Sequence, residues 1–272
     1  MRLNIRYIIP LLALWLFSAC LNEVDFPVER KGSFSLGLAA DDFAVEVETR
    51  AASELKASEA SDYTITLTEG SETVWAKRYA DIMQADYTQP LGSGYRVSAE
   101  NCTTEEAESA NNGWGRRRNA GTSDPFVIVS GATTPVTVHC TMANAGFCVI
   151  FDQSFTDYFS EYAVTTDDLR GLKFNAENAA EFDANRQLIH GTMAYYNVGD
   201  DGTHSLSVII SASAGWDGTT HLTRTLTLQQ GKVTRLRVRL TGSEPTEGNI
   251  GPVSISYDET FADGVTEEME LN

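Results

Sequence analysis

Apolar residues recur at every second position over most of this chain, and that spacing constrains its fold more than any other feature. Phe34, Leu36 and Leu38 alternate with small polar residues or glycine. The same spacing returns in six later segments, at residues 45–47, 63–67, 95–99, 206–210, 222–228 and 236–240. Side chains of a strand point alternately to opposite faces, so each segment predicts a strand with one buried and one wet face. No stretch beyond the N-terminus carries a sustained helical period, and residues 176–187 are predicted as a short helix or a long loop. The chain is therefore predicted to be all-β.

The chain also contains an internal repeat. Residues 131–140 align with 231–240 at an offset of 231 − 131 = 100, and each copy begins with a glycine that opens an alternating segment. Residues 62–66 align with 161–165 at an offset of 161 − 62 = 99. A repeated unit of this length is typical of a β-sandwich. We therefore predict two tandem β-sandwich domains, 32–142 and 143–272, that meet at a fixed angle near Ala143 because the joint has little flexible composition.

The C-terminal tail carries one more alternating segment, from Val253 to Tyr257, after a polar, turn-rich stretch. This segment can form the last strand of the second domain. Alternatively, it can be offered to another chain, since an unpaired strand is a template for pairing.

The first 19 residues predict a cleaved export signal. Arg2 and Arg6 form a basic start, an apolar run over 8–17 follows, and two small residues precede Cys20. This run is short for a membrane-spanning helix, which favours a signal peptide. Residues 17–20 resemble the lipobox of bacterial lipoproteins, which implies that Cys20 is lipidated and that 20–31 form a polar tether. An ordinary signal followed by an incidental cysteine is the alternative.

The chain is strongly acidic, with 38 acidic against 20 basic residues and a formal net charge of −18. Loss of Arg2 and Arg6 with the signal leaves 18 basic residues, so the mature charge is 18 − 38 = −20. Binding to phosphate backbones requires clustered Lys and Arg. Nucleic acid is therefore a poor partner, and so is a bare anionic membrane surface, and the acidity is interpreted as an aid to solubility.

Three cysteines remain once Cys20 is assigned to the lipid. An exported compartment permits disulfides, and three cysteines allow one bond with one thiol left over. A Cys102–Cys140 bridge is the favoured pairing. The alternative is that Cys102, Cys140 and Cys148 are all free and buried.

No sequence pattern predicts catalysis, a metal or a cofactor. The chain has no HExxH motif, no GxSxG motif and no phosphate-binding glycine loop. Acidic pairs are so numerous that some must lie close together by accident, and the pair at 200–201 before Gly202 indicates a hairpin turn. The histidines are interpreted as structural or solvent-exposed: His139, His190, His204 and His221.

The segment from Asn111 to Asn119 is the strongest candidate for a binding surface. Trp114 stands between two glycines and is followed by three consecutive arginines, Arg116, Arg117 and Arg118. Trp and Arg are enriched at binding hot spots. The alternative is that the Trp packs over its own domain while the arginines pair with nearby carboxylates. Trp216, also near glycines, is the matching candidate in the second domain, with the same alternative.

Several of these motifs together resemble a known family. A lipoprotein cysteine and an acidic tether precede the segment 32–36, and segments 62–65, 94–99 and 136–145 follow in order. Over residues 1 to about 260 the chain resembles the Bacteroidetes-type two-domain lipoproteins labelled as candidate cell-adhesion proteins, relatives of the fimbrillin-like proteins. The resemblance implies two immunoglobulin-like or transthyretin-like sandwiches held at the outer membrane and facing the cell surface. It rests on strand motifs, none of them catalytic, and implies little about a ligand.

These features predict a non-enzymatic surface lipoprotein that acts as an adhesion or surface-assembly module, with a protein or a glycan as its ligand. Two alternatives stay open. One is a glycan-binding lipoprotein that serves polysaccharide uptake, and the other is a fimbrial subunit or anchor.

Overall fold

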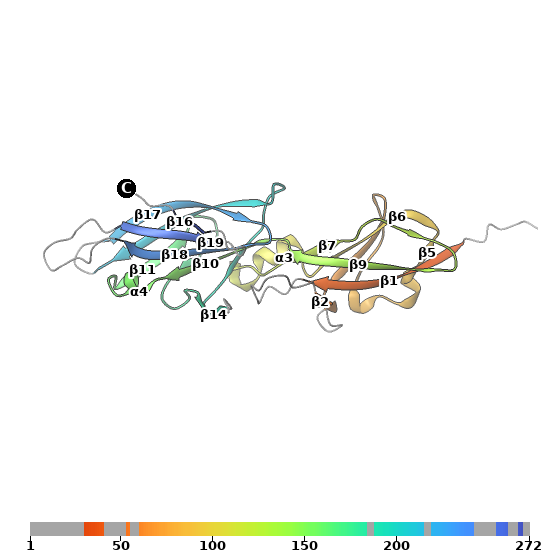
Figure 1. The fold of residues 1–272 in the computed structure, drawn as a ribbon, viewed down its shortest axis with the longest axis horizontal. Helices are drawn as coiled ribbons and strands as arrows, with labels where there is room; N and C mark the ends of the chain where they lie inside the picture. The colour runs from red at the N-terminus through yellow and green to blue at the C-terminus, as the bar shows by residue number, and fades with distance from the viewer. Residues whose placement is uncertain are drawn as a thin grey trace, which may run out of the picture.

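The computed structural model describes residues 30–40, 53–54, 60–183, 188–214, 219–241, 254–260 and 266–268. Strands dominate these segments and the helices are short, so the all-β prediction is confirmed. No helix within them is long and apolar enough to cross a membrane. Two elongated bodies lie end to end (Figure 1). We call residues 31–142 the N-terminal body and residues 145–268 the C-terminal body. Cys20, Trp216 and the strand predicted at 45–47 lie outside the described residues.

The N-terminal body is built on nine strands with the hydrogen-bonded order β2-β1-β9-β7-β6-β3-β4, where β5 pairs with β1 and β8 with β6. The strands are β1 (Lys31–Ala40), β2 (Ser53–Glu54), β3 (Thr64–Glu69), β4 (Glu72–Arg78), β5 (Thr88–Pro90), β6 (Gly92–Glu100), β7 (Asn119–Thr122), β8 (Phe126–Ile128) and β9 (Thr133–Met142). Short helices connect them: η2 (Tyr79–Asp81), η3 (Gln84–Tyr87), α3 (Thr104–Ser109) and η4 (Asn111–Gly113).

Strand β7 joins the two halves of this sheet. Ala120 pairs with Glu100 of β6 and also with Thr141 of β9, so one short strand bridges both neighbours. The crossing requires Gly121, because a Cβ atom there would lie 2.0 Å from the carbonyl oxygen of His139. The enclosed core consists of the inward residues of the alternating strands, including Phe34, Leu38, Ile65, Leu67, Tyr95, Val97, Val136 and Val138.

The C-terminal body contains two larger sheets with a core between them. One sheet has the order β15-β10-β18-β19-β20 and the other β12-β11-β16-β17, while β13 and β14 form a separate hairpin. The strands are β10 (Ala145–Phe151), β11 (Glu161–Thr166), β12 (Lys173–Phe174), β13 (Glu181–Phe182), β14 (Leu188–His190), β15 (Ala194–Tyr196), β16 (Thr203–Ser213), β17 (Thr219–Gln229), β18 (Val233–Thr241), β19 (Ser254–Thr260) and β20 (Thr266–Glu268). A short helix, α4 (Gln153–Thr156), follows β10.

The repeated segments occupy matching positions in the two bodies. Strand β1 pairs in parallel with β9, and β10 pairs in parallel with β18. Gly131 and Gly231 have φ values of 75° and 76° just before β9 and β18, which is a backbone region that glycine enters without cost. Val138 and Val238 are both fully buried on those strands. The second repeated pair lies on β3 and β11, each of which is hydrogen-bonded on both sides.

This architecture adds one feature to the sequence analysis and settles two expectations. The two parallel pairs mean that neither body is purely antiparallel. Residues 176–187 do not form a helix where the structure describes them, because this stretch makes a turn and then the hairpin strand β13. The tail segment at 254–260 pairs antiparallel with β18, from Arg235 opposite Thr260 to Thr241 opposite Ser254, so the tail adds a strand to its own body.

Candidate functional site

The predicted binding segment at 111–119 lies at the joint between the two bodies. It follows α3, whose first turn is closed by mutual bonds between Thr103 and Glu106 at 3.2 and 3.0 Å. Asn111, Asn112 and Gly113 then turn the chain sharply with positive φ values of 53°, 57° and 88°. Asn and Gly tolerate this left-handed region better than other residues, which explains their run here.

Trp114 packs against the core of the C-terminal body. Its ring meets Phe174 edge to face, with centroids 5.0 Å apart and planes at 84°. Its carbonyl oxygen accepts a hydrogen bond of 2.8 Å from the backbone N–H of Tyr195. At the next residue, a Cβ on Gly115 would lie 2.7 Å from the carbonyl oxygen of Tyr195, so the loop presses directly on β15. The ring is therefore a partly buried contact between the bodies.

Arg116 and Arg118 contact carboxylates, and Arg118 also contacts a backbone carbonyl. Arg118 donates to Glu100 at 2.8 Å and to the carbonyl oxygen of Cys102 at 3.2 Å. Arg116 lies 3.7 Å from Glu106 and is the most exposed of the three, while Arg117 is partly buried and also engaged. This placement favours internal packing of the loop, and its role in ligand binding stays a prediction. Trp216 is outside the described residues.

Arg170, in the turn between β11 and β12, ties the bodies together from the other side. One guanidinium nitrogen donates to the carbonyl oxygens of Gly113 at 3.1 Å and Tyr195 at 2.9 Å. Another lies 3.5 Å from the carboxylate of Asp168, and the guanidinium carbon stands 3.6 Å from the centre of the Tyr196 ring. A single cation thus contacts both bodies at once.

This environment shifts the ionisation of the groups around Arg170. Burial alone would raise the pKa of Asp168, but hydrogen bonds from Gly171 and Thr166 and the charge of Arg170 hold it below its ordinary value. Burial raises the pKa of Tyr196 to about 12. Burial and the nearby Arg170 lower the pKa of His204, whose ring centre is 5.0 Å from that of Tyr196.

Asn144 completes the joint from within the linker between β9 and β10. Its side chain accepts a hydrogen bond from the backbone N–H of Arg118 at 3.1 Å and donates to the carbonyl oxygen of Arg116 at 2.8 Å. Its own carbonyl oxygen accepts from Gly231 at 3.0 Å. Farther out, Asn197 donates to Glu108 of α3 at 3.1 Å. With these bonds, the two bodies are expected to hold a fixed relative orientation.

The predicted Cys102–Cys140 bridge is wrong, because the three cysteines among the described residues are free and buried. The Cys102 thiol donates to Asn101 at 3.4 Å, and the Cys140 thiol points toward the carbonyl oxygen of Ala99 at 3.8 Å. Burial raises the pKa of Cys140 to about 11 and that of Cys148 to about 12, so both thiols stay protonated and act as small apolar groups.

The histidines and acidic pairs do not gather into a site. Among the described residues, no cluster of three or more His, Cys, Asp or Glu side chains could hold a metal ion. Three of the four histidines are exposed and His204 is partly buried. The expected turn at 200–202 is present: the Asp201 carboxylate accepts from the backbone and the hydroxyl of Thr203, both at 2.9 Å, and these bonds lower its pKa.

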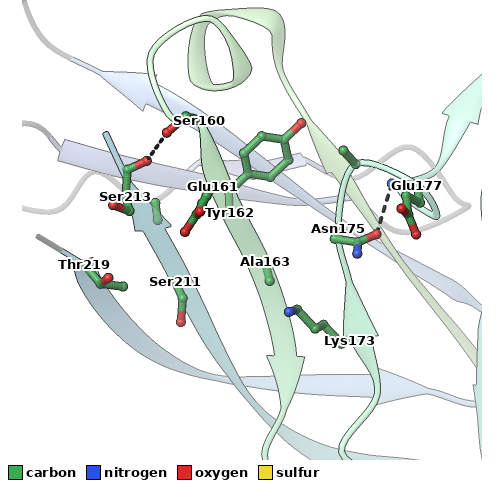
Figure 2. Close-up of a pocket in the computed structure, with 12 residues that line it drawn as sticks. Ser160, Glu161, Tyr162, Ala163, Lys173, Asn175, Glu177, Ser211, Ser213 and Thr219 are labelled. Atoms are coloured by element: carbon green, nitrogen blue, oxygen red, sulfur yellow. Dashed lines mark hydrogen bonds between the residues drawn. The ribbon is translucent and has the colours of Figure 1, made fainter. Parts of the chain in front are cut away.

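A groove that the sequence did not predict lies on the outer face of the β12-β11-β16-β17 sheet (Figure 2). Its floor is made of small side chains, since Ala163 of β11 stands opposite Ser211 of β16. The next outward row of the sheet contains Glu161, Ser213 and Thr219. Figure 2 shows Lys173 and Asn175 on the opposite side of Ala163 from Ser211 and Thr219. The groove has a volume of about 410 Å³.

The wall beside Lys173 is held by a local hydrogen-bond network. The Asn175 side chain accepts from the backbone of Glu177 at 3.0 Å, and Asn178 accepts from the backbone of Asn175 at 2.8 Å. Asn178 also donates to the carbonyl oxygen of Lys173 at 2.9 Å. On the floor, Ser211 bonds the His221 ring at 2.9 Å. These contacts fix the shape of the groove without using the charged ends of Lys173 and Glu177.

Comparison with known proteins gives a family. The family described as a domain of unknown function, DUF4493, matches residues 30–272. The chain belongs to this family. No curated protein matches the sequence.

This DUF4493 chain is similar to several solved structures from Bacteroidetes. A fimbrial assembly protein from Parabacteroides distasonis is 10% identical with a TM-score of 0.46, over 88% of this chain and 100% of the other. The fimbrial anchor protein Mfa2 from Porphyromonas gingivalis is 9% identical with a TM-score of 0.42, over 86% and 99%. A candidate polysaccharide-binding protein from Bacteroides thetaiotaomicron is 9% identical with a TM-score of 0.42, over 88% and 98%. These neighbours belong to the group that the sequence resembles, and at such scores they carry no argument about a ligand.

Proposed function

We propose that the chain is a non-enzymatic adhesion or surface-assembly module, anchored at the outer membrane through a lipid on Cys20. In this proposal, residues 32–142 and 143–272 are two tandem β-sandwich domains of the immunoglobulin-like or transthyretin-like kind. The support for two domains is that most of each body packs around a separate apolar core, with Trp114 as the large side chain that crosses from one body to the other core.

The observation that carries the proposal is the placement of the chain entry and the groove at opposite ends. Strand β1 begins at the right-hand end of the molecule in Figure 1, whereas α4 and the start of β11 lie at the left-hand end. The groove includes Ser160 and Glu161 at that left-hand end. A tether before residue 31 would therefore hold the N-terminal body near the membrane and project the groove away from it.

The joint between the two bodies supports the same proposal. Trp114, Arg170 and Asn144 each connect the two bodies through contacts of side chain and backbone. A surface module that presents a binding face at a distance gains from such a joint, because a fixed orientation lowers the entropy lost when a partner binds.

The anchor is tested by changing Cys20→Ser in cells that express the full chain. We expect the protein to move from the detergent-extracted membrane fraction to a soluble or uncleaved form. In parallel, protease added to intact cells should remove the C-terminal body of the parent protein. Unchanged partitioning of the variant, or protection of the parent until the cells are lysed, would contradict the proposal.

Adhesion itself is tested by comparing cells with and without the full chain for attachment to epithelial monolayers and to each other. Attachment that depends on the chain supports the module. The alternative role in glycan capture for uptake is favoured by one observation, the polar groove of Figure 2. Growth on defined polysaccharides as sole carbon source distinguishes that role, since only uptake predicts a growth defect.

A further inference from the structure

We propose that the groove on the outer face of the β12-β11-β16-β17 sheet is a binding site for a neutral glycan. The proposal rests on the proposed display of this face at the cell surface, and it adds the ligand class and the residues that bind it. The first argument is size. A volume of about 410 Å³ lies within the range of sites that take small organic ligands, roughly 300–1,000 Å³.

The floor of the groove suits a flat, polar ligand. Ala163 points outward from β11 beside Ser211 and is only 7% exposed, so it forms the bottom of the groove. Ser211 beside it offers a hydroxyl whose bond to His221 orients it. The outward side chains of the floor are small, and the one aromatic residue of the lining, Tyr162, is partly buried against the core of the C-terminal body, so an apolar ligand would gain little buried contact there.

The walls carry hydrogen-bonding groups of several kinds. Glu161 and Glu177 supply carboxylates, Lys173 an ammonium group, and Asn175 an amide. Glu161, Lys173 and Glu177 are all exposed residues of this lining. Hydrogen bonds with one charged partner are about twice as strong as those between neutral groups. Neighbouring hydroxyls of a sugar ring match this mixture of donors and acceptors.

Charge selects among glycans. The groove presents two carboxylates against one ammonium group, on a chain whose formal net charge is −18. A sulfated or uronic-acid polymer would meet repulsion on approach and at the site, because like charges placed together disfavour association. The walls therefore favour a neutral sugar over an anionic one.

A peptide strand is a weaker candidate for this groove. β16 is hydrogen-bonded along the groove to both β11 and β17, whereas β11 pairs with β12 only at Val164 and Thr165. Within the described residues, the edge of β11 that is free beside the groove is therefore limited to Glu161–Ala163, which offers an extended peptide few of the main-chain bonds that a full added strand makes. Side-chain contacts would have to supply most of the binding, and those are the contacts that a glycan uses.

The test uses the full chain, purified in detergent, on an array of neutral gluco-, galacto-, manno- and xylo-oligosaccharides with sulfated and uronic-acid oligosaccharides beside them. We expect at least one neutral oligosaccharide to bind with a dissociation constant of about 1 mM or tighter. The variant Ala163→Phe fills the floor without removing a polar group, and it should weaken that binding at least tenfold. The matched control is Ser205→Phe, on the exposed face of β16 outside the residues that line the groove, and it should bind as the parent does.

A second pair of variants guards against misfolding of the first. Glu161→Gln and Glu177→Gln keep the side-chain size and remove one charge each, and at least one should weaken the same binding severalfold. The proposal is overturned if no neutral glycan binds, if a sulfated glycan or a peptide is preferred, or if Ala163→Phe binds as well as the parent. Epithelial attachment is measured with the same variants. Attachment by the parent without any neutral-glycan binding on the array contradicts the glycan site but leaves the adhesion module, whereas parent cells that do not attach contradict the module.

Discussion

Replacing Trp114 with alanine distinguishes the two roles considered for this residue. If Trp114 is a packed contact between the bodies, the change removes its edge-to-face contact with Phe174 and opens a void at the edge of the C-terminal core. Removal of a fully buried Trp costs about 3–5 kcal/mol, and a partly buried one costs roughly half of that. Loss of the aromatic pair adds about 1 kcal/mol.

The expected total is therefore about 3 kcal/mol, which lowers the melting temperature by roughly 11 °C if the C-terminal body unfolds as a unit of its size. The measurement is thermal unfolding followed by circular dichroism. Trp114→Phe is the matched control, because it keeps an aromatic edge against Phe174 and should lose less than half as much. An unchanged melting temperature together with reduced attachment to cells would refute the packing argument and restore Trp114 as a surface anchor.

Three further predictions follow from the joint and from the thiols. Arg170→Met removes the charged hydrogen bond to Gly113 that spans the joint, together with the one to Tyr195 within the C-terminal body. The loss of about 2 kcal/mol or more should separate one calorimetric transition into two, whereas a single unshifted transition would count against the coupling. His204 has a folded-state pKa below its ordinary 6.5, so the unfolded chain takes up the proton first and stability falls as pH drops below about 6.5. The loss of stability from pH 7 to pH 5 should thus be smaller in His204→Asn than in the parent, and equal losses would exclude this cause. A thiol reagent should label no cysteine in the folded mature chain and three in the unfolded chain, because Cys102, Cys140 and Cys148 are buried and unpaired. Labelling of only one cysteine after unfolding would mean that a disulfide exists.

The strands could be predicted from the sequence because their signal is local. In β18, Leu236 and Val238 are buried while Arg237 between them is exposed, as period-two alternation requires. In β3, Ile65 and Leu67 are likewise buried, while Thr66 between them is partly exposed. The register and the pairing partners of the strands could not be predicted in this way. Alternation indicates which face of the sheet a residue occupies, but it does not indicate which strand lies beside it. The parallel pairings of β1 with β9 and β10 with β18 therefore came only from the structure.

The joint and the groove could not be predicted for the same physical reason. The importance of Trp114 was visible in its unusual neighbours, but its contact Phe174 lies 60 positions later and nothing local connects them. The groove combines Ala163, Lys173 and Ser211 from three strands, and each of these alone is an ordinary outward residue. One feature of the sequence did indicate the groove. Ser211 and Ser213 give the outer face of β16 small polar side chains, which leave space above the sheet.

The parallel pairing of β1 with β9 has a mechanical consequence. A pull on the tether would act on the first residues of β1, while a partner held at the far end would pull on β9 through its connection to β10. The two strands point in the same direction and are joined from Ser33 opposite Thr133 to Ala40 opposite Cys140. Force applied to opposite ends of two parallel neighbouring strands shears one strand along the other. The hydrogen bonds between β1 and β9 therefore bear the load together and do not open one by one. Such a clamp resists extension between a cell and the surface that it holds.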